Sequence, residues 1–336
     1  MLKIGLIGCG YWGKHYLRIL SRLPCELIGI ADTDPQKKKL AESFGVKYFR
    51  EIPKLLKKVD AVAVVTPPET HYKIARLALR RGKHVLLEKP FVFKSSQATE
   101  LREMALNSRL VLSPGLVYLY NPAVIKLKKM IDQGTLGKIY YITLDWLNLG
   151  IIRHDVNALW NFGPHPFSIL FNLINRFPEA VSAIGNDFIQ KGIEDFVICN
   201  LKYPDGMIVG IKLSWLHPEK VRSITVVGSK KLAKFDDTSA ASPLEIYDKG
   251  ITPEEFKQAQ NWENFAEFKS KTRYGAVEMP DLDKTEPLKD ELLNFIAASE
   301  NKEKLLATPE TAVSIVRLLE LVQKSLDKNG KIINVS

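Results

Sequence analysis

Three glycines near the N-terminus constrain the fold more than any other feature of the sequence. Gly8 ends the apolar run at residues 3–8, and Gly10 and Gly13 lead into a stretch with helical periodicity. Asp32 then ends the next apolar run, residues 26–32. A Gly-x-Gly-x-x-Gly turn between a strand and a helix, followed by an acidic residue at the end of the next strand, is typical of dinucleotide-binding folds. The first part of the chain is therefore predicted to bind a dinucleotide.

Short β-branched runs alternate with helical patterns over the first 120 residues. This alternation indicates βαβ units and a parallel sheet with helices on both faces. We therefore predict an N-terminal Rossmann domain over residues 1–120, with a doubly wound α/β fold. The predicted strands are residues 3–8, 26–32, 46–48, 60–65, 84–89 and 110–116. The first predicted helix follows the glycine turn and ends at residue 21, and the others cover residues 36–44, 70–81 and 97–107.

The pattern changes after Asn121-Pro122, where longer strands follow, separated by turn pairs such as Asp205-Gly206. Such turns are expected of antiparallel hairpins. Residues 121–336 are predicted to form an α+β domain for substrate binding and oligomerisation, with a large, mostly antiparallel open sheet. Residues 252–282 show no clean period and are predicted to be irregular with some helix. The predicted strands are 138–146, 197–203, 207–215 and 222–228, and the predicted helices are 123–133, 166–175, 288–300 and 309–326.

The composition is that of an ordinary globular protein, with 336 residues of which 46% are hydrophobic and 26% charged. No apolar stretch approaches the roughly 20 residues of a membrane span, and the N-terminus lacks a signal-peptide pattern, so a cytoplasmic location is expected. Cys9, Cys25 and Cys199 show no paired spacing, which predicts neither a disulfide framework nor a metal site. We interpret them as small buried apolar residues.

The formal net charge of +10 raises the question of a nucleic-acid partner. However, the basic residues are spread along the chain, as at residues 37–40 and 126–130, so a solvated lysine-rich surface is the better interpretation. The surplus would also suit an acidic substrate such as a nucleotide sugar. We predict a small-molecule partner, with no nucleic acid and no membrane.

The glycine turn predicts a distinct role for each of its glycines. Gly8 allows the tight bend, Gly10 lets the backbone approach a pyrophosphate, and Gly13 permits close packing of helix against strand. Tyr11 and Trp12 between them are assigned to the same cofactor-binding loop. The N–H groups at the helix start would bind the phosphates.

Asp32 predicts the identity of the dinucleotide. Its carboxylate is expected to accept hydrogen bonds from the adenosine ribose hydroxyls and would repel a 2′-phosphate, which favours NAD over NADP. Lys37 to Lys39 are near enough in sequence to assist a phosphate, although an exposed helix face explains them better.

Two further sites carry candidate catalytic residues. Lys89, in Glu88-Lys89-Pro90, ends a predicted strand at the edge where open α/β sheets bind ligands, whereas most lysines are merely solvated. His165 follows the loop that contains Gly163, at the start of a predicted helix. A structural histidine is the default interpretation there, and a site role is the alternative.

The order and spacing of four motifs resemble the Gfo/Idh/MocA oxidoreductase family from residue 2 to about residue 335. The motifs are GCGYWGKH at 8–15, VTPPETH at 65–71, EKP at 88–90 and NFGPH at 161–165. Each motif alone is unspecific, but the combination is specific. The segments at 120–142 and 153–170 resemble the nucleotide-sugar branch, and especially members similar to UDP-N-acetylglucosamine 3-dehydrogenases.

The resemblance implies roles for individual residues. Lys89 would hydrogen-bond the reacting hydroxyl beside the nicotinamide, and His165 would act as the general base as hydride leaves for the nicotinamide. Imidazole has a suitable pKa for that task, and an ammonium group stabilises an alkoxide-like oxygen. The remaining cofactor-binding residues implied by the family are Thr66, Pro67, His71, Glu88 and Asn121.

The chain departs from the family pattern at three positions. Asn161 stands where the family usually has Asp, so this side chain can orient a substrate hydroxyl but cannot share a proton. Ser168 replaces a second Asp, as in the nucleotide-sugar branch, and Leu116 replaces a common His. These departures affect the proton relay and the choice of substrate rather than hydride transfer.

Two more residues are candidates for substrate binding. Arg153 could hold a substrate phosphate or carboxylate as a bidentate fork, and a local pair with Asp155 on a surface loop is an equal alternative. Tyr118 could stack on a sugar or base, although packing is the commoner role of such an aromatic residue.

The predicted function is oxidation of a secondary hydroxyl of a sugar, most simply a nucleotide sugar. The alternatives are an inositol or free-sugar dehydrogenase, a glycosidase that retains its NAD, and a non-catalytic NAD-binding regulator. Regulators on this fold tend to lose the residues that match Lys89 and His165, which favours an enzyme. The alternating apolar residues at 207–215 further predict a homodimer or homotetramer formed through the open sheet.

Overall fold

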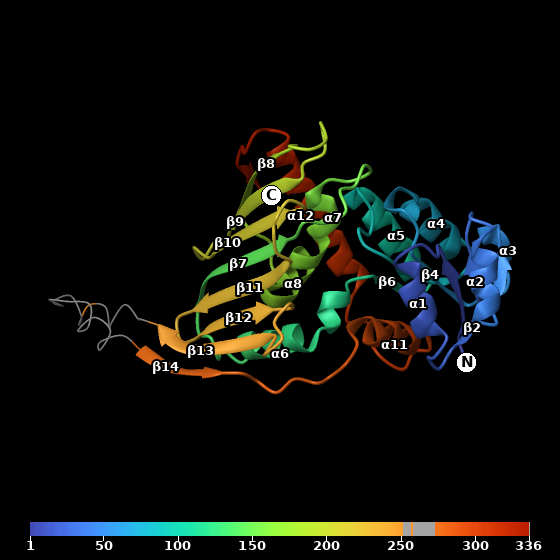
Figure 1. Cartoon of the computed structure of the whole chain (residues 1–336), viewed down its shortest axis with the longest axis horizontal. Coiled ribbons are helices and arrows are strands. Elements are labelled where there is room, and N and C mark those ends of the chain that lie inside the picture. The colour runs from blue at the N-terminus through green and yellow to red at the C-terminus, as the bar shows by residue number, and fades with distance from the viewer. Residues whose placement is uncertain (251–256, 258–272, 336) are drawn as a thin grey trace. The chain divides into compact units, whose positions relative to one another are not determined.

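The computed structural model describes residues 1–250, 257 and 273–335, and the described chain divides into two compact units (Figure 1). The first unit comprises Met1–Tyr120 and Thr285–Glu320, and the second comprises Asn121–Lys284 and Leu321–Ser336. The expected change after residue 120 coincides with this division. The expected domains differ from it in one respect, because Thr285–Glu320 belongs to the first unit.

A six-stranded parallel sheet with the order β3-β2-β1-β4-β5-β6 forms the first unit, which confirms the predicted doubly wound Rossmann fold. Its central strands are buried on both faces, and all of β4 is buried, which explains the unbroken apolar runs. The strands are β1 (Lys3–Ile7), β2 (Glu26–Ala31), β3 (Lys47–Phe49), β4 (Ala61–Val64), β5 (His84–Leu87) and β6 (Leu112–Pro114). The helices are α1 (Gly13–Leu20), α2 (Lys37–Ser43), α3 (Ile52–Leu56), α4 (Pro68–Arg80), α5 (Ser95–Asn107), the 3₁₀ helix η1 (Val117–Tyr120) and α11 (Pro287–Ser299).

Helix α11 belongs to the first unit because its apolar face completes that unit's core. Leu292 and Phe295 are fully buried in one cluster with Leu6 of β1 and with Tyr16 and Leu17 of α1. Burying two such side chains stabilises the unit by about 3–6 kcal/mol. The chain therefore returns to the Rossmann unit before α12 (Pro309–Leu326), which neither the length nor the local pattern predicted.

The second unit contains a nine-stranded sheet with the order β14-β13-β12-β11-β7-β10-β9-β8-β15. Its pairs are antiparallel except for β7 and β10, which confirms the predicted mostly antiparallel sheet. The strands are β7 (Ile139–Leu147), β8 (Ala180–Asn186), β9 (Phe196–Lys202), β10 (Ile208–Ser214), β11 (Val221–Gly228), β12 (Leu232–Asp236), β13 (Leu244–Gly250), β14 (Arg273–Glu278) and β15 (Ile333–Asn334).

Five strands of this sheet were not predicted: β8, β12, β13, β14 and β15. Strand β14 corrects the expectation that residues 252–282 are irregular, because Arg273–Glu278 pairs with β13 at the edge of the sheet. Of the rest of that segment, residues 252–256 and 258–272 lie outside the described residues. All six residues of β14 are at least partly exposed, so the segment lacks the alternation that marks a half-buried strand.

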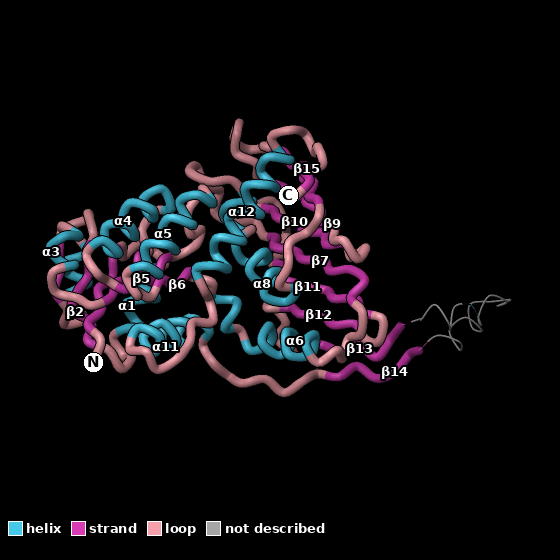
Figure 2. The backbone as a smooth tube through the Cα atoms, turned by 180° about the vertical axis from the view of Figure 1, so that it is seen from behind, coloured by secondary structure: helices cyan, strands magenta, loops and turns pink. Residues whose placement is uncertain are grey.

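Helices α6 (Pro122–Asp132) and α8 (Pro164–Ile174) lie side by side against one face of this sheet (Figure 2). Val209, Ile211 and Leu213 of β10 point toward that face and are fully buried. On the other face of the sheet, Lys212 of β10 and Tyr141 of β7 are exposed. The predicted alternation is therefore present, with one face packed and the other accessible in the single chain.

The three cysteines are unpaired; Cys9 and Cys199 are buried and Cys25 is half-buried. Within the described residues, no group of three or more His, Cys, Asp or Glu side chains is placed to hold a metal ion. None of the described helices combines the length and apolar character required to cross a lipid bilayer.

Candidate functional site

The glycine turn has the geometry that each of its three glycines predicted. Gly8 has a φ of +88°, and a Cβ there would lie 2.6 Å from the carbonyl oxygen of Val65. A Cβ on Gly13 would lie 2.3 Å from the carbonyl oxygen of Gly8, so only glycine permits this approach of helix and strand. A Cβ on Gly10 would meet no atom within 4 Å. The turn thus leaves open space beside Gly10, as the approach of a pyrophosphate requires.

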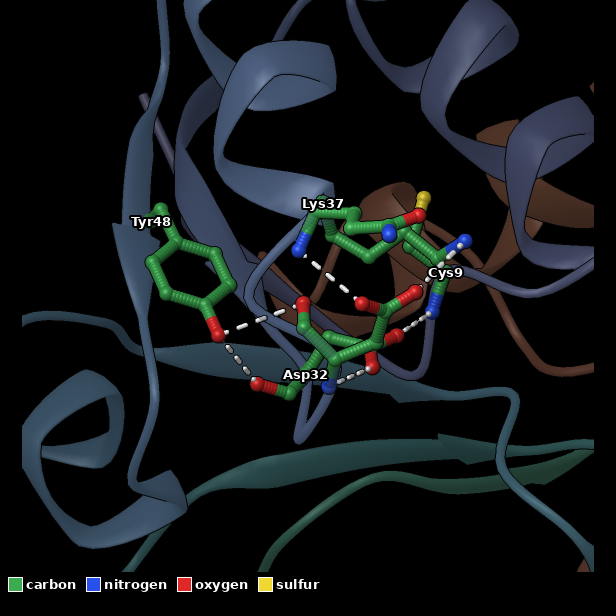
Figure 3. A network of polar contacts seen from close by, with 6 residues as sticks. Cys9, Asp32, Lys37 and Tyr48 are labelled. Atoms are coloured by element: carbon green, nitrogen blue, oxygen red, sulfur yellow. Dashed lines mark hydrogen bonds and ion pairs between the residues drawn. The ribbon is translucent and has the colours of Figure 1, made fainter.

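Asp32 connects the glycine turn to the end of β2 through hydrogen bonds of its carboxylate (Figure 3). Its carboxylate accepts hydrogen bonds from the N–H groups of Cys9, at 2.7 Å, and Asp34, at 2.9 Å. The hydroxyl of Tyr48 donates to the carbonyl oxygen of Asp32 at 2.8 Å. Burial, followed by the charge of Asp32, raises the pKa of the Cys9 thiol to about 11, so this thiol is neutral near neutral pH.

Lys37 lies beside this carboxylate network rather than on an isolated helix face. Its ammonium group is 3.2 Å from the carboxylate of Asp34 (Figure 3). Lys37 thus already has a carboxylate partner, which weakens the alternative that it serves a 2′-phosphate.

The Thr66-Pro67 loop after β4 borders the glycine turn. A Cβ on Gly8 would lie 2.8 Å from the Cγ2 of Thr66, and the Thr66 hydroxyl is hydrogen-bonded to the Thr70 hydroxyl at 2.7 Å. His71 is fully buried, and its ring nitrogens each lie 2.9 Å from a carbonyl oxygen, of Pro90 and of Thr66. Burial lowers the pKa of His71, and the two carbonyl groups oppose that effect. This ring therefore links the loops that follow β4 and β5.

Glu88 connects the glycine turn with the backbone of Lys89. Its Oε1 accepts from the Trp12 indole N–H at 2.5 Å and from the Tyr16 hydroxyl at 2.7 Å. Its Oε2 accepts from the backbone N–H of Lys89 at 2.8 Å. Glu88 is buried and Lys89 is half-buried. The candidate catalytic lysine is thus placed at the same sheet edge as the predicted cofactor loop, with its backbone held by a side chain that also holds Trp12.

In the second unit, α7 (Ala158–Phe162) runs into α8 almost without interruption. Gly163 between them keeps helical dihedrals, with φ −51° and ψ −39°, and its N–H donates to Leu159 at 2.8 Å. Asn161 and His165 are four residues apart along this helical path, so both side chains lie on one face. Both are half-buried. The helix thus brings together the two residues that the sequence proposed for this part of the site.

Asn157 anchors the start of α7. Its Oδ1 accepts from the N–H of Trp160 at 3.0 Å, and its Nδ2 donates to Glu194 at 2.7 Å and to Gln323 at 3.0 Å. The Trp160 indole N–H donates to the same Gln323 oxygen at 3.1 Å. The hydrogen bonds of the Asn157 side chain therefore fix the position of the helix that carries Asn161.

The remaining predicted site residues have these environments. Arg153 forms a bidentate pair with Asp155, at 2.8 and 2.5 Å, on a partly exposed loop. Asn121 caps α6, accepting from the N–H of Ala123 at 2.9 Å and donating to Asp237 at 3.2 Å. Tyr118 is half-buried on η1, and Tyr11 is 83% exposed on the glycine turn. Substrate or cofactor contacts of these residues stay predictions.

Arg222 is a buried polar residue beside Phe162 of α7, and the sequence analysis did not identify it. Its guanidinium donates to the carbonyl oxygen of Leu147 at 2.9 Å and to the Asn148 side chain at 2.5 Å, and lies 4.8 Å from the centre of the Phe162 ring. A signal was available, because Arg222 occupies the inward-facing phase of β11 together with Ile224.

These features define an oxidoreductase that binds a dinucleotide. The chain matches the model of the oxidoreductase family with an NAD-binding Rossmann fold over residues 2–116, and the GFO/IDH/MocA C-terminal domain over residues 124–234. It belongs to the GFO/IDH/MocA family, and its first unit is an NAD-binding Rossmann domain. The glycine turn and Asp32 fit that cofactor.

Three relatives are informative about this membership. UDP-N-acetylglucosamine 3-dehydrogenase of Acidithiobacillus ferrooxidans is 26% identical over 74% of this chain and 78% of its own. The structure of that enzyme superposes with a TM-score of 0.82 at 22% identity, covering 97% of this chain and 98% of the other.

Glucose-6-phosphate 3-dehydrogenase of Bacillus subtilis is 30% identical over 70% of this chain and 74% of its own. The structure of the WlbA dehydrogenase of Bordetella pertussis in complex with NADH and UDP-GlcNAcA has a TM-score of 0.79 at 18% identity, covering 100% of this chain and 99% of the other.

Proposed function

We propose that the protein is an NAD-dependent dehydrogenase that oxidises a secondary hydroxyl of a nucleotide sugar, in the manner of UDP-N-acetylglucosamine 3-dehydrogenase. The observation that carries the proposal is the Glu88 carboxylate, which bonds both Trp12 of the glycine turn and the backbone N–H of Lys89. The backbone of a residue with a cationic side chain is thus connected to the loop predicted to hold the dinucleotide. The similarity to UDP-N-acetylglucosamine 3-dehydrogenase supports the choice of substrate.

Each candidate residue has a defined task in this reaction. The Lys89 ammonium group donates a hydrogen bond to the reacting hydroxyl and stabilises the negative charge that develops on its oxygen. The His165 imidazole accepts the hydroxyl proton. Asn161, on the same helix face, orients a neighbouring hydroxyl through its amide. When bound, NAD supplies the hydride acceptor.

The cofactor-binding residues complete the proposal. Gly8, Gly10 and Gly13, with Tyr11 and Trp12, form the pyrophosphate loop, and Asp32 accepts from the adenosine ribose. The remaining cofactor contacts are assigned to Thr66, Pro67, Glu88, Lys89 and Asn121, and the substrate contacts to Lys89, Tyr118, Arg153, Asn161 and His165. His71, which is fully buried, would serve the cofactor site by holding the Thr66 and Pro90 loops rather than by a direct contact.

Oxidation of a sugar phosphate is a second candidate. The 30% identity to glucose-6-phosphate 3-dehydrogenase, higher than that to the nucleotide-sugar enzyme, favours it. Arg153 would suit either substrate, because both carry phosphate.

A substrate panel decides between these candidates. The protein is incubated with NAD and with UDP- and dTDP-sugars, glucose 6-phosphate, free sugars and inositols, and formation of NADH is followed by absorbance. NADH formation with one nucleotide sugar supports the proposal, and formation with glucose 6-phosphate alone replaces it by the second candidate. Product without NADH accumulation would indicate a glycosidase that retains its cofactor, and NAD binding without any turnover would indicate a regulator.

Substitutions test the assigned roles. Lys89→Met and His165→Asn are expected to reduce kcat by about a hundredfold or more while leaving NAD affinity close to that of the wild type. Lys57→Met and His217→Asn, both outside the candidate site, serve as matched controls and should retain turnover. Near-normal kcat in His165→Asn would show that another group is the base.

We further propose a cytoplasmic homodimer or homotetramer that assembles through the accessible face of the nine-stranded sheet. The unpaired cysteines fit a reducing compartment. A monomeric mass by light scattering at working concentration would contradict the assembly.

A further inference from the structure

A second carboxylic acid is buried near Glu88. Glu291 lies on α11 between the buried residues Leu288 and Leu292, and its relative exposure is 0%. Among the described residues, no hydrogen bond to either side-chain oxygen meets full geometry, although the Tyr16 hydroxyl and the Leu116 N–H lie near enough to interact with the carboxyl group. A buried carboxylate that is so weakly hydrogen-bonded is costly, so this side chain requires an explanation.

The groups around Glu291 come from four parts of the first unit. They are Tyr16 of α1, Glu88 after β5, the backbone N–H of Leu116, and Tyr120 of η1. Tyr16 and the Leu116 N–H face the carboxyl group and favour its ionised form, but burial and the charge of Glu88 outweigh them. Burial is the larger cause and the charge of Glu88 the second, and both raise the pKa of Glu291 well above its usual value.

Both carboxylate oxygens of Glu88 already accept hydrogen bonds. It accepts from the Trp12 indole, the Tyr16 hydroxyl and the Lys89 N–H, which is the pattern of an ionised carboxylate. The Tyr16 hydroxyl has one proton, and it points to Glu88 at 2.7 Å. A second negative charge at Glu291 would repel Glu88 and compete for that proton.

We propose that Glu291 is a positioning residue that stays protonated, so that Glu88 remains the single anion of this cluster and keeps Trp12, Tyr16 and the Lys89 backbone in place. Ionisation of Glu291 would loosen the contact between the glycine turn and the Lys89 loop. The consequence for Lys89 as a catalytic group rests on the function proposed above, whereas the protonation itself does not.

The first test is the pH dependence of stability, compared between wild type and Glu291→Gln. Because the folded-state pKa is raised, the wild type loses stability as pH rises from the unfolded value, about 4.5, through the folded value. Within that window the unfolding equilibrium should shift toward the unfolded state by up to about tenfold per pH unit relative to Glu291→Gln. Glu310→Gln, an exposed glutamate of the same unit, should track the wild type. Parallel curves for wild type and Glu291→Gln would overturn the proposal.

The second test uses the unmodified protein and does not depend on the variant folding. The infrared C=O stretching band of a protonated carboxylic acid should persist at pH 7 to pH 8, where ordinary carboxyl groups are ionised. Its absence throughout that range would overturn the proposal.

The third test follows NAD affinity by calorimetry against pH. Affinity should fall at alkaline pH in the wild type and stay flat in Glu291→Gln, as expected of a residue that positions the loop. An identical alkaline decline in both proteins would overturn the positioning role. The proposed dehydrogenase function fails by a different result, the absence of turnover with every sugar substrate, which leaves these three readouts unaffected.

Discussion

The two units position their candidate catalytic residues in different ways. In the first unit, Lys89 is held through its own backbone, because its N–H donates to the Glu88 carboxylate and the His71 ring joins the loops after β4 and β5. In the second unit, His165 lies on a helix, and the start of that helical path is anchored by the side chain of Asn157. The first arrangement connects Lys89, through Glu88 and Trp12, to a glycine turn with strict steric limits. The second depends on the side-chain network of Asn157, Glu194 and Gln323.

This difference predicts how each region responds to substitution. A substitution in the glycine turn should lower the free energy of unfolding strongly where a Cβ has no room, and hardly at all where space for a Cβ is open. Changes around α7 should instead be graded, because each hydrogen bond of Asn157 contributes separately.

The largest effect is expected from Gly13→Ala, compared with Gly10→Ala. A Cβ on Gly13 would meet the carbonyl oxygen of Gly8 at 2.3 Å, so the free energy of unfolding should fall by about 3 kcal/mol and NAD binding should be lost. Gly10→Ala has open space and should keep its thermal midpoint while losing about tenfold or more in NAD affinity. Thermal unfolding with and without NAD measures both, and equal midpoints for the two variants would contradict the distinction.

A smaller loss is expected from Asn157→Ala. Removal of the helix cap and of the bonds to Glu194 and Gln323 should lower the free energy of unfolding by about 2 kcal/mol. Turnover should fall while NAD affinity is retained, because the NAD-binding turn lies in the other unit. Asn157→Ser keeps a side-chain acceptor for the Trp160 N–H without placing a carboxylate against Glu194, and should lose less by denaturant unfolding. Equal losses for the Ala and Ser variants would show that the cap contributes nothing.

Asp32→Ala is expected to change cofactor preference more than stability. Without the carboxylate, NAD affinity should weaken by about tenfold, equivalent to about 1.4 kcal/mol, and the preference over NADP should narrow. Titration with both dinucleotides measures the ratio, and Glu51→Ala, which removes an exposed carboxylate paired with Lys54 in the same unit, is the matched control. An unchanged ratio in Asp32→Ala would assign the preference to another residue.

The smallest effect on stability is expected from Arg153→Ala. Its pair with Asp155 is partly exposed, so loss of the pair should change the free energy of unfolding by less than about 1 kcal/mol. If Arg153 binds the substrate phosphate, KM should rise about tenfold for a nucleotide sugar and not for an uncharged sugar. Asp155→Ala, which removes this carboxylate from the guanidinium, should not raise that KM. An unchanged KM in Arg153→Ala would contradict the substrate-binding role, and the pair with Asp155 would then be the role of Arg153.

Several parts of the molecule could be predicted because their signals are local. The glycine turn, Asp32 and the apolar strands of the first unit each follow from a few neighbouring residues whose sterics or periodicity permit one conformation. The same holds for most of α8, because its apolar residues predicted a helix over 166–175. The predicted loop before it was wrong, since α7 and Gly163 continue the helical path toward the N-terminus. The boundary predicted after residue 120 likewise rested on a local change of pattern in the sequence.

Other parts could not be predicted because their signals are not local. Strand β15 has two residues and pairs with β8, more than 100 residues earlier in the chain. Arg222 and Glu291 occupy inward-facing positions in the alternation of β11 and the spacing of α11. A charged residue at such a position predicts burial, but its partners depend on distant segments.

The sequence by itself determined the NAD-binding half, because the glycine motif has strict steric requirements, and its resemblance to a family predicted the class of reaction and the candidate catalytic residues. Only the tertiary structure decided that α11 returns to the first unit, that Glu88 links Trp12 to Lys89, and that Glu291 lies buried beside them. These features arise from burial of apolar surface between segments far apart in the chain, and the resulting low-dielectric surroundings set the protonation of the groups they enclose.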